Sequence, residues 1–210
     1  MGYCSLRVVT GPAVEPVSLP DATAHLRLDM DDSQLPAYLG AARGWAEQYL
    51  NRALITQTLR YTLSPSQPPA ASFGGPINPI IFVMPLTWWP VSGQPIELPM
   101  APVQSITEVV QRERAGATRT LDPAKDFFAD ASNEPARVTL RSIGQGLGSD
   151  LSITYKAGFG DDATSVPLPI VQAIKLLVGW FYEHRGDDDA AEPPKAVRML
   201  LNPYRQAFFA

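Results

Sequence analysis

The sequence has only one cysteine and two histidines in 210 residues. A single thiol, Cys4, excludes an intramolecular disulfide, and one cysteine with two histidines is too few ligands for a structural zinc site. Nucleophilic catalysis needs a base beside the nucleophile, and His25 and His184 are the only candidates of the usual kind. Both fall near the ends of expected helices, so we interpret them as surface or capping residues. We therefore expect no enzymatic activity.

Charge is also scarce, at 18% of residues against about 25% in an average soluble domain. The 17 basic and 21 acidic residues give a net charge of −4. This sign argues against a protein that grips nucleic acid over its whole surface. The aspartates at 29, 31 and 32 and at 187–189 lack the glycine and glutamate spacing of a calcium loop. We expect no cofactor and no metal ion.

Long apolar runs are missing as well. The longest, residues 80–91, contains Pro85 and Pro90 and is shorter than the roughly 20 residues that a membrane-spanning helix needs. The N-terminus lacks the basic start and apolar stretch of a secretory signal. We expect a soluble protein that is made in the cytoplasm and has no contact with a membrane.

Four helices are expected from apolar residues at spacings of three and four. The first begins at Ser18, an N-cap, and would bury Leu19, Ala22 and Leu26. The others cover residues 33–53, with Ser33 at the start, 167–185 and 196–201. Proline lies in the first turn of the first three helices, where it is tolerated.

Strands are expected between these helices. Residues 58–63 alternate apolar and polar side chains, and residues 105–110, 137–141 and 151–155 are separated by turn residues. We therefore predict an α+β fold with a mainly helical core of long amphipathic helices, built from both ends of the chain. We predict three parts: an N-terminal helical part of the core over 1–57, a β-rich insertion over 58–160, and C-terminal helices with a docking tail over 161–210.

Residues 61–96 contain eight prolines and no charged residue. This segment is too proline-rich for a regular helix and too apolar for a solvated linker. Two interpretations stay open. The segment packs on its own domain, or it contacts an adjacent subunit or tail component through a set of large apolar side chains, namely Ile80, Ile81, Phe82, Trp88 and Trp89.

The C-terminal region combines basic and aromatic residues, as protein interfaces do. We interpret it as a docking segment. Its candidate contact residues are Lys195, Arg198, Tyr204, Arg205, Phe208 and Phe209.

The order of features along the chain resembles the head-tail connector, or adaptor, proteins of tailed bacteriophages and gene transfer agents. Four stretches carry the resemblance, and none is a catalytic signature. They are Val8–Pro12 with Glu15–Leu19 and His25–Leu28; Leu39–Tyr49 with Arg52–Gln57; Leu98–Val109; and Tyr155–Gly160 with Val166–Ile174, Trp180–Arg185 and Leu201–Arg205. Residues 64–96 depart from the pattern.

The resemblance implies a structural subunit of the particle neck, assembled in the bacterial cytoplasm. It implies a ring of twelve copies that binds the portal protein and a stopper or tail-completion protein, while DNA passes through the lumen without specific binding. We assign the portal contact to the C-terminal residues given above. Two alternatives stay open: another neck protein, such as a stopper or tail-completion protein, or a carbohydrate-binding or hydrolytic accessory that uses Trp88 and Trp89 with Asp161 and Asp162.

Overall fold

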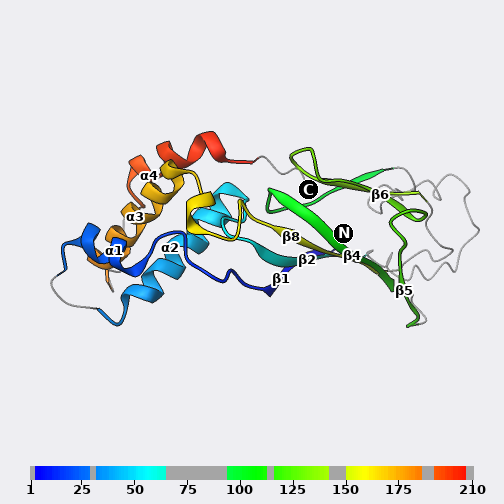
Figure 1. Cartoon of the computed structure of the whole chain (residues 1–210), viewed down its shortest axis with the longest axis horizontal. Coiled ribbons are helices and arrows are strands. Elements are labelled where there is room, and N and C mark those ends of the chain that lie inside the picture. The colour runs from blue at the N-terminus through cyan, green and yellow to red at the C-terminus, as the bar shows by residue number, and fades with distance from the viewer. Residues whose placement is uncertain are drawn as a thin grey trace, which may run out of the picture.

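The computed structural model describes residues 3–28, 32–64, 94–112, 116–141, 150–185 and 192–206. Figure 1 shows an elongated chain with its helices at one end and its sheets at the other. The helices are α1 (Leu19–Leu26), α2 (Leu35–Leu50), α3 (Leu168–Glu183) and α4 (Lys195–Leu201), with the 3₁₀ turns η3 (Ala163–Ser165) and η4 (Asn202–Tyr204). The strands are β1 (Tyr3–Thr10), β2 (Gln57–Ser64), β3 (Pro95–Glu97), β4 (Val103–Arg112), β5 (Thr118–Thr120), β6 (Phe127–Asp130), β7 (Arg137–Leu140) and β8 (Asp150–Ala157).

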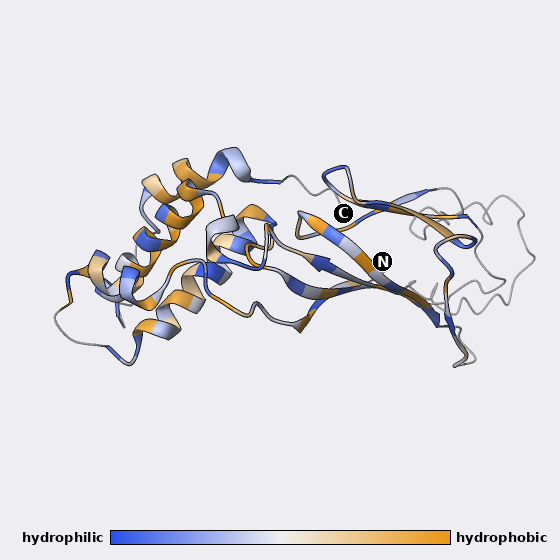
Figure 2. Cartoon of the chain, in the orientation of Figure 1, coloured by the Kyte–Doolittle hydropathy of each residue, from blue (hydrophilic) through white to orange (hydrophobic). Residues whose placement is uncertain are grey.

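The helical end has its own hydrophobic core, where α2 and α3 pack against each other and α4 packs on α3. Figure 2 shows hydrophobic residues gathered where these helices face one another. The core residues recur at helical spacing along α2 and α3, as the sequence predicted. They include Leu35, Leu39, Ala42, Ala46, Leu50, Ile170, Ala173, Ile174, Leu177 and Val178.

The helix starts are confirmed in part. Ser18 is the N-cap of α1, and its Oγ accepts a hydrogen bond from the Asp21 N–H at 3.2 Å. Leu19, however, is 47% exposed, so the expected buried stripe of α1 is wrong at that residue. The N-cap of α2 is Gln34, without a side-chain hydrogen bond, where Ser33 was expected.

The β end holds two antiparallel sheets around a second hydrophobic core. The larger sheet has the strand order β1-β2-β8-β4-β5, and the smaller has the order β3-β7-β6. The alternation predicted for β2 is correct, because Leu59 and Tyr61 are buried while Arg60 is exposed. The larger sheet supplies Leu59, Val109, Leu151, Ile153 and Tyr155 to this core, and the smaller supplies Ile96, Phe127, Val138 and Leu140.

The prediction of a mainly helical core with long helices is wrong. About a third of the described residues are helical and about a third lie in strands, and the longest helices have 16 residues. The predicted N-terminal helical part, residues 1–57, also contains the strand β1, which pairs with β2 at the edge of the larger sheet. The partner of β1 lies some 50 residues away in the sequence, so this pairing could not be predicted from either segment alone. The strands β3, β5 and β6 are too short to show a clear alternation. The division of the chain at 57 and 160 stays a prediction.

Two features join the helical end to the sheets. Glu47 of α2 is buried, and its Oε1 accepts hydrogen bonds from the Leu54 N–H and from Gln57 Nε2 at the start of β2, both at 3.0 Å. Gly158 follows β8 with a φ of +143°, and a Cβ there would lie 2.5 Å from the Thr56 nitrogen. Only glycine lets these two backbone segments approach so closely.

Candidate interaction surfaces

The candidate catalytic residues of the sequence lie on separate elements of the fold. His184 ends α3 as its C-cap, with Nδ1 2.9 Å from the Trp180 carbonyl and its ring stacked on Trp180. The capping role predicted for His184 is thus confirmed. His25 is exposed in the last turn of α1, and Cys4 is exposed in β1. Asp161 and Asp162 are adjacent and exposed in the turn after β8.

Within the described ranges, no group of three or more His, Cys, Asp or Glu residues could hold a metal ion. The same part of the chain has no helix that is both long and apolar enough to cross a bilayer.

The structure places four of the six docking residues on α4 and the turn after it. Lys195 opens α4 and is exposed. The Arg198 guanidinium is ion-paired with Glu192 at 3.0 Å, and its buried Nε has no hydrogen-bond partner among the described residues. Phe208 and Phe209 lie outside the described residues.

Tyr204 and Arg205 contact the end of α2. The Tyr204 carbonyl accepts a hydrogen bond from Arg52 Nε at 2.6 Å, and the Arg205 guanidinium lies 5.3 Å from the Tyr49 ring centroid. The Gln206 N–H donates to the Leu50 carbonyl at 2.9 Å. These contacts hold the chain against the C-terminal end of α2 up to residue 206, the last residue that the structure describes.

The other predicted contact set, Ile80, Ile81, Phe82, Trp88 and Trp89, lies outside the described residues. Its role stays a prediction.

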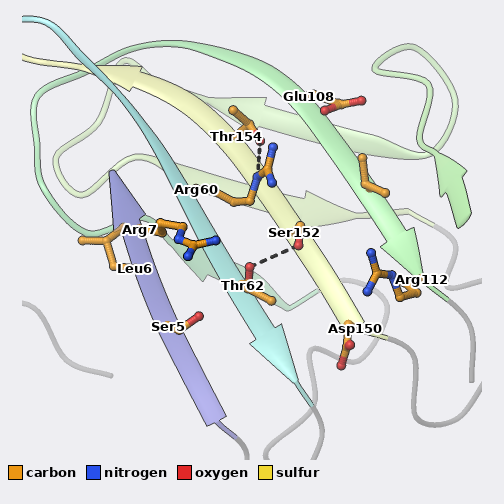
Figure 3. A pocket seen from close by; sticks show the side chains of 11 residues that line it. Ser5, Leu6, Arg7, Arg60, Thr62, Glu108, Arg112, Asp150, Ser152 and Thr154 are labelled. Carbon is orange, nitrogen blue, oxygen red and sulfur yellow. Dashed lines mark hydrogen bonds between the residues drawn. The ribbon is translucent and has the colours of Figure 1, made fainter. Parts of the chain in front are cut away.

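A polar groove of about 520 Å³ crosses the outer face of the larger sheet, opposite the hydrophobic core. Figure 3 shows its arginines and hydroxyls on β1, β2, β8 and β4. Arg60 Nε lies 3.3 Å from Thr154 Oγ1, and Thr62 Oγ1 lies 3.1 Å from Ser152 Oγ. The lining also includes Ser5, Arg7, Glu108, Arg112 and Asp150, together with the apolar residues Leu6 and Val110.

The charges of this groove are unevenly distributed. Arg112 is the cross-strand partner of Asp150, whereas Arg7 is the cross-strand partner of Arg60. Among the described residues, neither Arg7 nor Arg60 has an ion-pair partner. Because neither arginine is ion-paired, this corner of the groove carries an excess of positive charge. Two like charges in register on neighbouring strands also repel each other and destabilise the sheet.

Sequence reasoning missed this groove. The alternation over residues 58–63 already placed Arg60 and Thr62 on the polar face of a strand. It could not show that Arg7 lies opposite Arg60, because that depends on the pairing of β1 with β2.

The chain is thus an α+β protein with a helical end and a two-sheet end. No family model and no curated protein matches it. Several solved structures, however, are similar to it. A chain from "Neck of native GTA particle computed with C12 symmetry" is similar with a TM-score of 0.64 and 27% identity, over 98% of this chain and 97% of that one.

Two further chains share the fold over the same extents of both sequences, at 24% identity. One comes from the neck of an empty GTA particle computed with C6 symmetry, with a TM-score of 0.68. The other comes from the virion of a native gene transfer agent particle, with a TM-score of 0.66. The likeness covers the helical end and both sheets together.

Proposed function

We propose that this protein is a structural, non-enzymatic subunit of the neck of a phage or gene transfer agent particle. The observation that carries the proposal is the likeness, over 98% of the chain, to a chain of a GTA particle neck computed with C12 symmetry. A match over nearly the whole length of both chains means that the complete arrangement of helices and sheets is shared. The resemblance noted in the four sequence stretches supports the same assignment.

Within the neck, we assign the protein to the adaptor layer, as a ring of twelve copies between the portal and the stopper or tail-completion protein. A closed ring of twelve copies requires a heterologous contact between neighbouring subunits. The segment from Ile80 to Trp89 is our candidate for that contact or for one with the next tail component. The C-terminal residues from Lys195 onward are our candidate for the portal contact.

The net charge supports a role beside passing DNA. At −4 per chain, twelve copies carry about −48, which is the same sign as the phosphate backbone. Such a ring repels a duplex on average and does not retain it, because non-specific DNA binding requires the release of counterions by basic side chains.

The test is a pull-down of the tagged protein from particle-producing cells, with mass spectrometry and negative-stain imaging of the eluate. We expect portal and tail proteins to elute with it, and particles to be labelled at the neck. Recovery of the protein alone, or with metabolic enzymes, would refute the assignment.

A further inference from the structure

The strand β1 forms a long edge of the larger sheet that has no partner within the described part of the chain. β1 has eight residues and pairs only with β2. Other edge strands, β3, β5 and β6, have three, three and four residues. Proteins protect sheet edges by keeping them short, or with proline, charged side chains or β-bulges. β1 has no proline or lysine, its one charged residue is Arg7, and its irregularity lies near its end, between Val8 and Thr10.

The hydrogen bonding of β8 determines which backbone groups of β1 point away from β2. The Gly158 N–H donates to the Pro102 carbonyl at 2.9 Å, next to the paired residues Val103 and Ala157. In an antiparallel ladder this bond flanks a non-hydrogen-bonded pair, so the peptide groups of Ala157 point towards β2.

Along a strand, the peptide groups of successive residues point alternately to the two neighbouring strands, so the orientation of Ala157 fixes that of β2 and then of β1. Ala157 pairs with Gln57, and the register from Gln57 to Leu63 is regular, so even-numbered residues of β2 point towards β1. Arg60 and Thr62 pair with Arg7 and Ser5. The amides of Ser5 and Arg7 are therefore bonded to β2, and those of Cys4, Leu6 and Val8 point to the free edge.

The two faces of this edge differ in chemistry. Leu6 and Val8 lie on the same face of the sheet as the core residues Tyr61 and Leu59, their register partners, yet they are 41% and 55% exposed. On the other face, Arg7 lies beside Arg60 in the polar groove (Figure 3), without a carboxylate partner in the described chain. A strand added here would meet apolar side chains on one face and positive charge on the other.

We propose that β1 is the acceptor edge for an extended segment of another protein, in which apolar residues alternate with aspartate or glutamate. The added backbone bonds to Cys4, Leu6 and Val8. Its apolar side chains cover Leu6 and Val8, and its carboxylates lie beside Arg7. Charge complementarity favours this occupant, because a carboxylate there offsets the repulsion between Arg7 and Arg60.

Other occupants match the edge less well. Pairing β1 with β1 of a second copy adds another arginine to the positive face. Residues 103–109 of β4 are not paired with β5 and form a second edge, but the pairing of this part with β8 is irregular between Val103 and Ser105 and between Ile106 and Glu108. A DNA phosphate would satisfy Arg7 but would leave the apolar face and the row of peptide groups unmatched.

The test measures amide hydrogen exchange of the whole chain by NMR, with an acetylated eight-residue peptide of alternating valine and glutamate as the probe. We expect exchange at Cys4, Leu6 and Val8 to slow at least tenfold at saturating peptide, while Ser5 and Arg7 are slow from the start. A matched peptide of alternating valine and lysine should have no effect. The Arg7→Glu variant places a carboxylate opposite Arg60, so it should fold and should reverse the preference between the two peptides.

A pair of proline variants separates edge pairing from folding. Leu6→Pro removes an outward N–H and should abolish the slowing while shifting the melting temperature by only a few degrees. Ser5→Pro removes a bond to β2 and should lower the melting temperature much further.

Four results would overturn the proposal. They are no slowing with the glutamate peptide at millimolar concentration, equal slowing with both peptides, slowing that depends on protein concentration alone, and slowing caused by a DNA duplex. The last two would assign the edge to a second copy or to DNA. None of them bears on the neck assignment, which the pull-down tests separately.

Discussion

Glu47 of α2 accepts a hydrogen bond from Gln57 of β2 at 3.0 Å, and this contact ties the helical end to the larger sheet. The same Oε1 accepts from the Leu54 N–H, and Oε2 accepts from Arg43 Nη1 at 3.0 Å. Both donors to Oε1 lie in the segment that leads from the helices into β2. Glu47 is therefore a structural carboxylate, and its effects should appear in stability.

Removing this carboxylate should destabilise the fold. Glu47→Ala leaves the Leu54 N–H, Gln57 and part of Arg43 without acceptors in a buried site, and we expect a loss of about 3 kcal/mol in the free energy of unfolding. Glu47→Gln keeps an acceptor for Leu54 and Gln57 and should lose about 1 kcal/mol. Urea denaturation of both variants measures the difference, and equal losses would contradict the role of Oε1.

Glu47 should also make stability depend on pH. Burial raises the pKa of Glu47 above its ordinary value of 4.5, against the opposing effects of the Leu54 N–H and Arg43. A carboxyl with a raised pKa binds its proton more tightly in the folded state, so its contribution to stability falls as pH rises from the unfolded pKa through the folded pKa. We expect the wild type to lose stability relative to Glu47→Gln across that window. A constant difference between the two pH profiles would refute the raised pKa.

Gly158 should tolerate no side chain. In Gly158→Ala, the new Cβ meets the backbone of Ile55 and Thr56 at 2.5–2.7 Å, and alanine is also strained at a φ of +143°. We expect a loss of more than about 3 kcal/mol in the free energy of unfolding. Gly116→Ala is the matched control, because Gly116 has a φ of +89° but open space around its Cα. It should lose only about 1 kcal/mol, and equal losses would show that the close approach has no cost of its own.

The portal contact predicts different results for two C-terminal truncations. Deleting residues 207–210 leaves every described contact with α2 in place, so the protein should keep its melting temperature while failing to join particles. Deleting residues 203–210 also removes the contacts of Tyr204 with Arg52 and of Gln206 with Leu50, and should lower the melting temperature by several degrees. Normal particle assembly with the shorter truncation would refute docking through Phe208 and Phe209.

The sequence predicted the helices better than the sheets, for a physical reason. The apolar residues of α2 and α3 repeat within one helix, so Leu39, Ala42 and Ala46 indicate the buried face by themselves. The sheet depends on pairs far apart in sequence, such as Arg7 with Arg60. β1 was missed because its only partner in the sheet, β2, lies some 50 residues away in the sequence, and the groove was missed with it.

The Trp88–Trp89 pair gives the test of the predicted subunit contact. If these side chains bind a neighbouring subunit, the double variant Trp88→Ala, Trp89→Ala should weaken ring assembly at least tenfold, because aromatic residues dominate protein interfaces. The melting temperature of the free subunit should change by only a few degrees. Mass photometry measures the ring, and differential scanning calorimetry measures the subunit. Trp180→Phe, in the helical end, is the matched control and should leave the ring intact. A large fall in the melting temperature of the double variant would show instead that the tryptophans pack on their own domain, since removing a buried aromatic side chain costs about 3–5 kcal/mol.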